Sequence, residues 1–269
     1  MANPPRKLAF ILASTDQGTL IVNRFDFNVL NESVTIGVGH MLLNYGSYDA
    51  QEVDTVRQLL NLRRQYFGDG VVALDCGANI GVFTVEWAKA MTGWGQVVAI
   101  EAQERVFYAL AGNIAINNCL NARALHAAVG AQPGVLRIPQ PNYLAPGTFG
   151  SLELKQTERT ENIGQPVSYA DEHLVGVQAI TLDALGLNRL DLLKIDVEGM
   201  ELEVFEGARA TIGKYLPVIV VERIKTDQEA LKAVLESHGY RTFETGMNII
   251  AIHTSDPSLT HVSLRTPEI

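Results

Sequence analysis

Short apolar runs that end in acidic or turn-forming residues recur along the chain from residue 71 onward. Such runs are typical of buried strands, and apolar residues repeating every three or four positions are typical of helices. The pattern predicts strands at 71–75, 97–101, 122–127, 190–196 and 218–222, and helices at 80–91, 104–117, 200–211 and 227–238. Strands alternating with helices favour an α/β fold with a mostly parallel sheet and helices on both faces.

The segments around this alternation have other patterns. "YRTFET" and "NIIAIHT", joined by Gly246-Met247, predict a C-terminal β-hairpin. Residues 131–180 contain five prolines and are interpreted as an insertion of short strands and loops near the site. Residues 1–70 are expected to be an N-terminal appendage packed on the core, with short strands at 8–12 and 19–22 and a helix at 51–65. Residues 71–269 would form the main domain.

Composition and charge narrow the class of protein. The chain has 269 residues and 47% hydrophobic content, enough for one large α/β domain with an elaboration or at most two small domains. The net charge is −9 and no basic run exceeds Arg63-Arg64, so we expect no nucleic-acid partner. No apolar stretch approaches the roughly 18 residues that span a bilayer. Two cysteines and a run too short for a signal peptide favour a cytoplasmic protein.

The stretch "ALDCGANIGVFTVEWA", residues 73–88, reads as a strand, a tight turn and a helix. This arrangement aims a helix N-terminus at a nucleotide-type ligand. The turn offers only Gly77 and Gly81, so it lacks the three glycines of a dinucleotide-binding turn and the lysine of a P-loop. It resembles D-x-G-A-N-x-G, motif I of the class I S-adenosylmethionine (SAM)-dependent methyltransferases, and in particular the FkbM family.

The resemblance extends from about residue 45 to 252. Its other blocks are "VVAIEAQERVFYALAGNIAINN", "LDLLKIDVEGMELEVFEGA" and "PVIVVE". It implies a Rossmann-like class I methyltransferase fold, SAM as the cofactor, and methyl transfer to a hydroxyl of a sugar or natural product. The partner would then be a small-molecule or glycan acceptor. Residues 1–70 and 131–180 are where acceptor choice is expected to lie.

The resemblance places cofactor contacts at the ends of the first three strands. Glu101 would accept hydrogen bonds from the ribose hydroxyls, and N–H groups of the first turn would suit the carboxylate of SAM. The plainer alternatives are a tight turn and a solvated strand-end acid. The candidate cofactor-binding residues are Asp75, Gly77, Ala78, Asn79, Gly81, Glu101, Ala102 and Ala128.

Charged residues after the fourth and fifth predicted strands are the candidates for the chemistry. In open α/β sheets, ligands bind at the carboxyl ends of the strands. Asp196 is the first choice of general base, with Glu222 or Glu198 second. Lys194 either takes part in catalysis or only pairs with Glu198 or another acid. Three further acids are interpreted as the solvated face of the helix that follows: Glu201, Glu203 and Glu206.

Asp196 and Glu222 should approach each other, since they end neighbouring strands. Two carboxylates in a cleft either repel, which raises one pKa and creates a general base, or share a cation such as Mg²⁺. The sequence leaves a metal site at Asp196 and Glu222 as one of these two alternatives.

Three other functions stay open at this point. An NAD(P)-dependent oxidoreductase is disfavoured by the missing third glycine. A non-catalytic SAM-binding protein would share the same turn. A nucleic-acid methyltransferase is third, because the chain lacks a basic face and an N/D-P-P-Y/F motif. The sequence does not reveal the acceptor, and it leaves an oligomer open.

Overall fold

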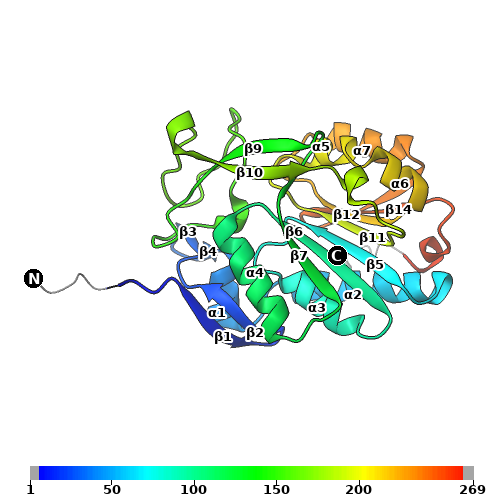
Figure 1. Ribbon diagram of the computed structural model, residues 1–269, viewed down its shortest axis with the longest axis horizontal. Coiled ribbons are helices and arrows are strands. Elements are labelled where there is room, and N and C mark those ends of the chain that lie inside the picture. Colours follow the sequence, from blue (N-terminus) through cyan, green and yellow to red (C-terminus); the bar gives the residue numbers. More distant parts are fainter. Residues whose placement is uncertain (1–5, 263–269) are drawn as a thin grey trace, which may run out of the picture.

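A seven-stranded sheet forms the centre of the protein, in the order β13-β14-β12-β11-β5-β6-β7 (Figure 1). The computed structural model describes residues 6–262. The strands are β5 (Val71–Cys76), β6 (Gly95–Glu101), β7 (Ala122–His126), β11 (Leu192–Ile195), β12 (Val218–Glu222), β13 (Tyr240–Thr245) and β14 (Asn248–His253). β14 runs antiparallel to both of its neighbours, β12 and β13, while the other pairings of this sheet are parallel, and β13 and β14 form the expected C-terminal hairpin. The Rossmann-like α/β fold is confirmed.

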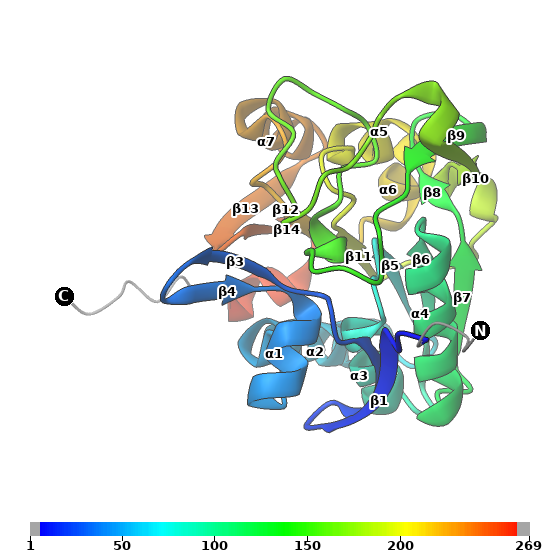
Figure 2. The same ribbon diagram turned by 90° about the vertical axis from the view of Figure 1, so that its left-hand side faces the viewer.

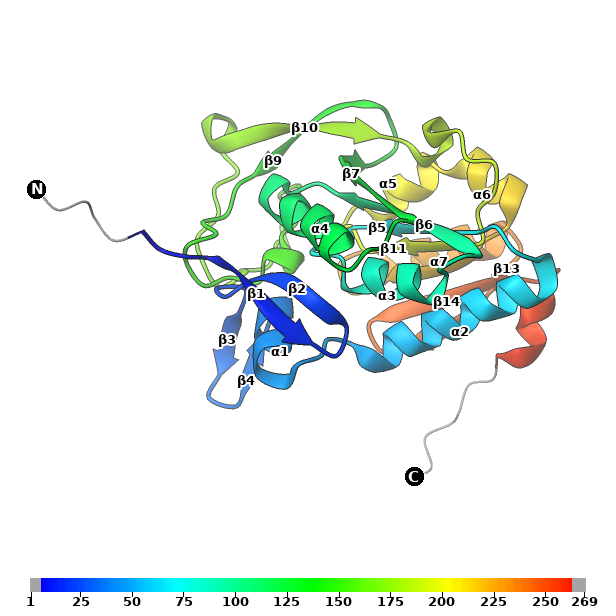
Figure 3. The ribbon, with the colours of Figure 1, turned by 60° about the horizontal axis from the view of Figure 1, so that its bottom comes forward.

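Helices cover both faces of this sheet. One face carries α2 (Ala50–Phe67), α3 (Val82–Ala90) and α4 (Glu104–Ile116), which lie in front of the sheet in Figure 3. The other carries α5 (Glu201–Glu206), α6 (Arg209–Tyr215) and α7 (Gln228–Ser237). Along β5, Val71 and Ala73 pack on the first face, and Val72 and Leu74 pack on the second. Burial on both faces explains why the central strands are uninterrupted apolar runs.

Two hairpins and two helices precede the first strand of the sheet. They are β1 (Phe10–Thr15) with β2 (Gly18–Asn23), β3 (Asn28–Asn31) with β4 (Val34–Ile36), α1 (Val38–Tyr45) and α2. Figure 2 shows β3, β4 and α1 on the same side of the molecule as α2 and α3. The fully buried Asn113 of α4 bonds both the N–H and the carbonyl of Ile21 and so holds β2 against this helix.

Residues 128–180 form a second, three-stranded sheet and a long loop. The strands are β8 (Ala128–Val129), β9 (Gly134–Pro139) and β10 (Leu174–Ile180), in the order β8-β10-β9. The loop contains the 3₁₀ helix η1 (Phe149–Ser151). Buried Asp26 accepts hydrogen bonds from the N–H groups of Gly39, at 3.0 Å, and Phe149, at 3.1 Å. One carboxylate therefore joins the N-terminal region to the loop.

The single helix expected at 200–211 is two helices, and that part of the prediction is wrong. A Cβ on Gly207 would lie 2.2 Å from the carbonyl oxygen of Gly130, so the chain passes β8 closely at this point. The side chain of Asp183 accepts hydrogen bonds from the N–H groups of Ala210 and Thr211, which begins a new helix there. Within residues 6–262, no helix is long and apolar enough to cross a membrane.

Candidate active site

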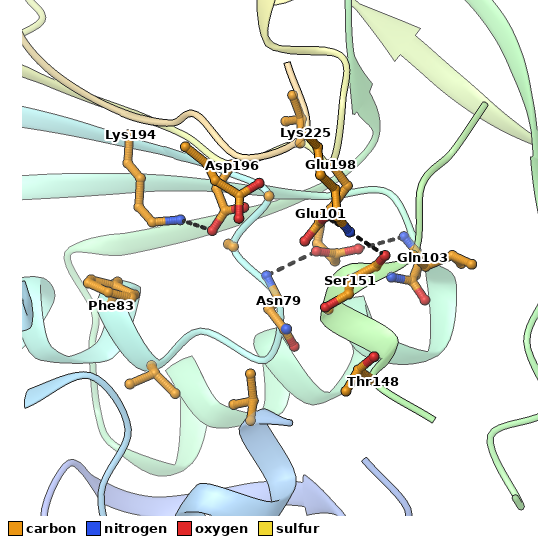
Figure 4. Close-up of a pocket in the computed structure, with 18 of the residues that line it drawn as sticks. Asn79, Phe83, Glu101, Gln103, Thr148, Ser151, Lys194, Asp196, Glu198 and Lys225 are labelled. Carbon is orange, nitrogen blue, oxygen red and sulfur yellow. Dashed lines mark hydrogen bonds and ion pairs between the residues drawn. The ribbon is translucent and has the colours of Figure 1, made fainter. Parts of the chain in front are cut away.

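A cavity of about 410 Å³ lies at the carboxyl ends of β5, β6, β11 and β12. This volume suits a small-molecule site. Residues 35–52 of the N-terminal region and residues 148–154 of the loop complete its wall. Figure 4 shows Glu101, Asp196 and Glu198 gathered around it. Ten of the predicted site residues line the cavity: Gly77, Ala78, Asn79, Glu101, Ala102, Ala128, Lys194, Asp196, Glu198 and Glu222.

Glu101 presents a buried carboxylate to the cavity. Its Oε2 accepts the N–H of Asn79 at 2.9 Å, and its Oε1 accepts the N–H of Gln103 at 2.7 Å. Burial raises the pKa of Glu101 to about 7, although these backbone hydrogen bonds favour the charged form. A carboxylate oxygen can accept two hydrogen bonds, so both oxygens can also accept a ligand hydroxyl.

The N–H groups of the turn after β5 are used within the protein. Gly77 and Ala78 donate to the carbonyl of Ile100 at 2.9 and 3.0 Å, and Gly81 donates to the carbonyl of Ala78 at 2.9 Å. With the N–H of Asn79 on Glu101, none of these four donors is left for the carboxylate of a cofactor. That part of the expectation is not met.

Gly77 is required for close packing of two strand ends. Its φ is 79°, a conformation that favours glycine. A Cβ at this position would lie 1.7 Å from the carbonyl oxygen of Asp196. The turn after β5 therefore presses directly on the residue that follows β11.

Asp75 and Gly81 lie behind the turn and do not line the cavity. The Oδ2 of Asp75 accepts the hydroxyl of Thr84 at 2.6 Å, and its Oδ1 lies 4.0 Å from the Nζ of Lys194. A Cβ on Gly81 would lie 2.5 Å from Leu110 of α4. Both predicted cofactor residues therefore shape the turn from the side away from the cavity.

Two buried lysines hold two of the acids. The Nζ of Lys194 donates to Asp196 at 2.7 Å, and the Nζ of Lys225 donates to Glu198 at 2.5 Å. Burial opposes the charge of Lys194, but Asp196 and Asp75 outweigh it, so the pKa of Lys194 is raised. The sequence left open whether Lys194 pairs with Glu198 or with another acid. In the structure it pairs with Asp196 and not with Glu198.

Asp196, Glu198 and Glu222 form an acid trio. Each offers one carboxylate oxygen, and these oxygens lie within 4.8 Å of one another. Burial, followed by the negative charge of Asp196, raises the pKa values of both Glu198 and Glu222. Glu222 is only 9% exposed, and its buried Oε2 has no hydrogen-bond partner within residues 6–262. The expected approach of Asp196 and Glu222 is confirmed.

Glu201 was expected on a solvated helix face, and this is wrong. It is 0% exposed, and its Oε1 accepts the N–H groups of Val197 at 3.2 Å and Gly199 at 3.1 Å. These bonds fix a left-handed turn in which Glu198 has a φ of 55° and Gly199 has a φ of 91°. Glu201 thus positions the turn that carries Glu198 into the cavity.

Several cavity residues were not predicted. Tyr48, Asp49 and Glu52 come from the N-terminal region, and Asn248 donates to Glu52 at 2.7 Å. Lys225 had a usable signal, because it lies three residues after Glu222 at the same edge of the sheet. Nothing in the helical pattern of residues 50–67 distinguishes Glu52 from an ordinary surface acid.

Comparisons with known proteins match this chain to a family model and to other methyltransferases. Residues 75–242 match the sequence model described as "Methyltransferase FkbM domain". The chain is 28% identical over 192 residues to Methyltransferase sdnD from Sordaria araneosa, covering 62% of this chain and 72% of the relative. It is also 28% identical over 185 residues to Methyltransferase 1 from Beauveria bassiana (strain ARSEF 2860), covering 65% and 74%.

Matches among solved structures include the methyltransferase FkbM from Methylobacillus flagellatus KT. The TM-score is 0.47 at 15% identity, and the match covers 71% of this chain but 48% of that one. Another is the tRNA (uracil-54, C5)-methyltransferase of Pyrococcus abyssi, in complex with S-adenosyl-L-homocysteine. It has a TM-score of 0.44 at 14% identity and covers 91% of this chain and 44% of that one.

Proposed function

Because this chain belongs to the FkbM family of SAM-dependent methyltransferases, we propose that it methylates a hydroxyl of a sugar or small natural product. The observation that supports this is the set of residues that line one cavity. Glu101 lies at the end of β6, and the acid trio lies at the ends of β11 and β12 in the same cavity. A ribose-binding acid and proton-accepting groups are thus within reach of one bound cofactor.

The cofactor half of the cavity fits SAM in two respects. Glu101 is held by two backbone N–H groups in a position to accept the ribose hydroxyls. The small side chains of Ala102, Ala127 and Ala128 line the neighbouring wall and leave room for a flat ring. SAM, when bound, supplies an electrophilic methyl group on a sulfonium.

Asp196 is our candidate for the group that receives the hydroxyl proton. Its side chain is 33% exposed, and Lys194 bonds its Oδ2, which fixes the carboxylate and leaves Oδ1 to accept. Alignment of hydroxyl and methyl in the cavity would supply most of the rate, since well-oriented pairs have high effective molarity. Glu222 and Glu198 are the second choices. A cation such as Mg²⁺ on Asp196 and Glu222 is the alternative way to activate the hydroxyl.

Titration calorimetry tests the cofactor first. SAM should bind with micromolar or tighter affinity, about −8 kcal/mol at one micromolar. Heat with NAD or ATP and none with SAM or S-adenosylhomocysteine would overturn the methyltransferase assignment, and heat with NAD alone would support an NAD(P)-dependent oxidoreductase.

Release of S-adenosylhomocysteine with a panel of hydroxylated sugars and natural products tests the reaction. Methyl transfer to nitrogen or carbon acceptors alone would overturn the O-methyl assignment. Tight SAM binding with no product from any acceptor would indicate a non-catalytic SAM-binding protein.

A further inference from the structure

The acid trio carries more negative charge than its surroundings balance. Asp196, Glu198 and Glu222 face the cavity, and Lys194 and Lys225 are the lysines that contact them within residues 6–262. Three carboxylates against two ammonium groups leave one negative charge over when all three are ionised. The excess is larger in practice, because Lys194 also lies 4.0 Å from Asp75.

Within residues 6–262, Glu222 is the member of the acid trio that forms no ion pair with a lysine. Asp196 has Lys194 and Glu198 has Lys225, whereas Oε2 of Glu222 is buried without any hydrogen-bond partner in the described part of the chain. Buried charges in proteins are paired or coordinate metals. Glu222 as a residue is 9% exposed and lines the cavity, so its carboxylate can serve as a cation ligand there.

The spacing of the trio is close to that of ligands around one ion. Its three oxygens lie within 4.8 Å of one another. Oxygens on opposite sides of an octahedral Mg²⁺ are about 4 Å apart, since each bond is about 2.1 Å long. Neighbouring ligands of such an ion are about 3 Å apart, so the three side chains would draw closer together to share one ion. Carboxylate oxygens are also the ligands that Mg²⁺ and Mn²⁺ prefer.

We propose that Asp196, Glu198 and Glu222 together bind one hard divalent cation, Mg²⁺ or Mn²⁺, at the ends of β11 and β12. The proposal rests on the proposed function for its purpose, because a cation there would lie beside the acceptor hydroxyl and favour loss of its proton. Glu201 positions this site without touching the ion, since it holds the turn that presents Glu198.

Binding of Mn²⁺ to the full chain tests the site without cofactor or acceptor. The protein is first treated with a chelator, and free Mn²⁺ is then followed by electron paramagnetic resonance. We expect one Mn²⁺ per chain, competed by Mg²⁺. Glu222→Gln and Glu198→Gln should each weaken binding by about tenfold or more, since each removes a charged ligand and loss of even an outer-shell partner typically weakens metal binding by about tenfold or more.

Glu161→Gln is the matched control, because Glu161 is a cavity acid outside the trio, exposed and 4.0 Å from Lys225. It should bind Mn²⁺ like the wild type. Thermal unfolding of every variant confirms that it is folded. Wild-type protein without a stoichiometric Mn²⁺, or equal weakening by Glu161→Gln and Glu222→Gln, would overturn the site.

Methyl transfer in the presence of chelator separates the two proposals. Stoichiometric Mn²⁺ without any methyl transfer would leave the cation site standing and overturn the proposed function. Full turnover in chelator, together with no Mn²⁺ binding, would overturn the cation site and leave the proposed function standing. Loss of turnover that Mg²⁺ restores supports both.

Discussion

At the level of single residues, Glu101 is under two opposing influences. Burial raises its pKa to about 7, yet the role we propose for it, accepting both ribose hydroxyls, requires the ionised form. SAM affinity should therefore fall as the pH drops below 7, by up to about tenfold per pH unit. Calorimetry between pH 6 and about 8.5 measures this. Glu101→Gln, which cannot ionise, should bind weakly with a flat pH profile, and an equally steep profile in that variant would contradict the assignment.

Replacing Glu101 and Asp196 separates cofactor binding from chemistry. Glu101→Ala loses two charge-assisted hydrogen bonds, so SAM affinity should fall by roughly 2–4 kcal/mol while turnover at saturation changes little. Asp196→Asn keeps the shape but should lower turnover by about two to four orders of magnitude with near-normal SAM affinity. Steady-state kinetics with varied SAM measures both.

Two results would contradict the roles proposed for Asp196 and Glu101. Normal turnover in Asp196→Asn would transfer the role to Glu198 or Glu222. Unchanged affinity in Glu101→Ala would mean that the ribose lies elsewhere in the cavity.

The sequence was informative about strand ends and uninformative about partners. Glu101, Asp196 and Glu222 follow apolar runs, and parallel strands bring such residues to one edge, so their convergence was predictable. That Lys194 bonds Asp196, and that Lys225 bonds Glu198, depends on side-chain directions that no spacing along the chain specifies.

At the level of elements, the turn after β5 gives a sharp test of backbone packing. Gly77→Ala would place a Cβ 1.7 Å from a backbone oxygen, so β5 or β11 must move, and we expect a loss above about 4 kcal/mol. Gly93→Ala is the matched control. Its φ of 82° is similar, but a Cβ there meets no atom within 4 Å, so it should cost only about 1–2 kcal/mol. Urea unfolding compares the two, and equal losses would show that conformation alone matters at Gly77.

Elements that were missed have weak local signals. In α1, only Val38, Gly39 and Leu42 are buried, and β3 and β4 present mostly exposed residues. Their positions depend on contacts such as Asp26 with Gly39, which link residues that no periodicity connects. The break between α5 and α6 likewise depends on Gly130 and Asp183, which lie outside the helices.

At the level of the whole molecule, Asp26 joins the N-terminal region to the loop that contains η1. Burial raises its pKa from 3.8 to about 6, against two backbone hydrogen bonds. Because the folded protein then holds this proton more tightly than the unfolded chain, Asp26 makes the fold more stable as the pH falls through about 6 toward 3.8, and the full gain is reached only below 3.8. The difference in pKa corresponds to about 3 kcal/mol.

Asp26→Asn should remove this part of the pH dependence. The rise in Tm on acidification should shrink by several degrees, at about 2–4 °C per kcal/mol. Asp183→Asn is the control, since Asp183 also accepts two backbone N–H groups but is exposed. An unchanged slope in Asp26→Asn would show that Asp26 does not titrate in this range.

The cavity wall combines segments that lie far apart along the chain, and this bears on how the protein diverges. Residues 77–103 belong to the sheet and its turns, whereas residues 35–52 precede the first strand of the sheet. Substitutions in the earlier segment reshape part of the wall without altering the strands that carry Glu101 and Asp196. Under the proposed function, selection for a new acceptor could therefore act on the N-terminal segment while the strands that carry Glu101 and Asp196 are inherited unchanged. Grafting that segment between relatives is the corresponding engineering route.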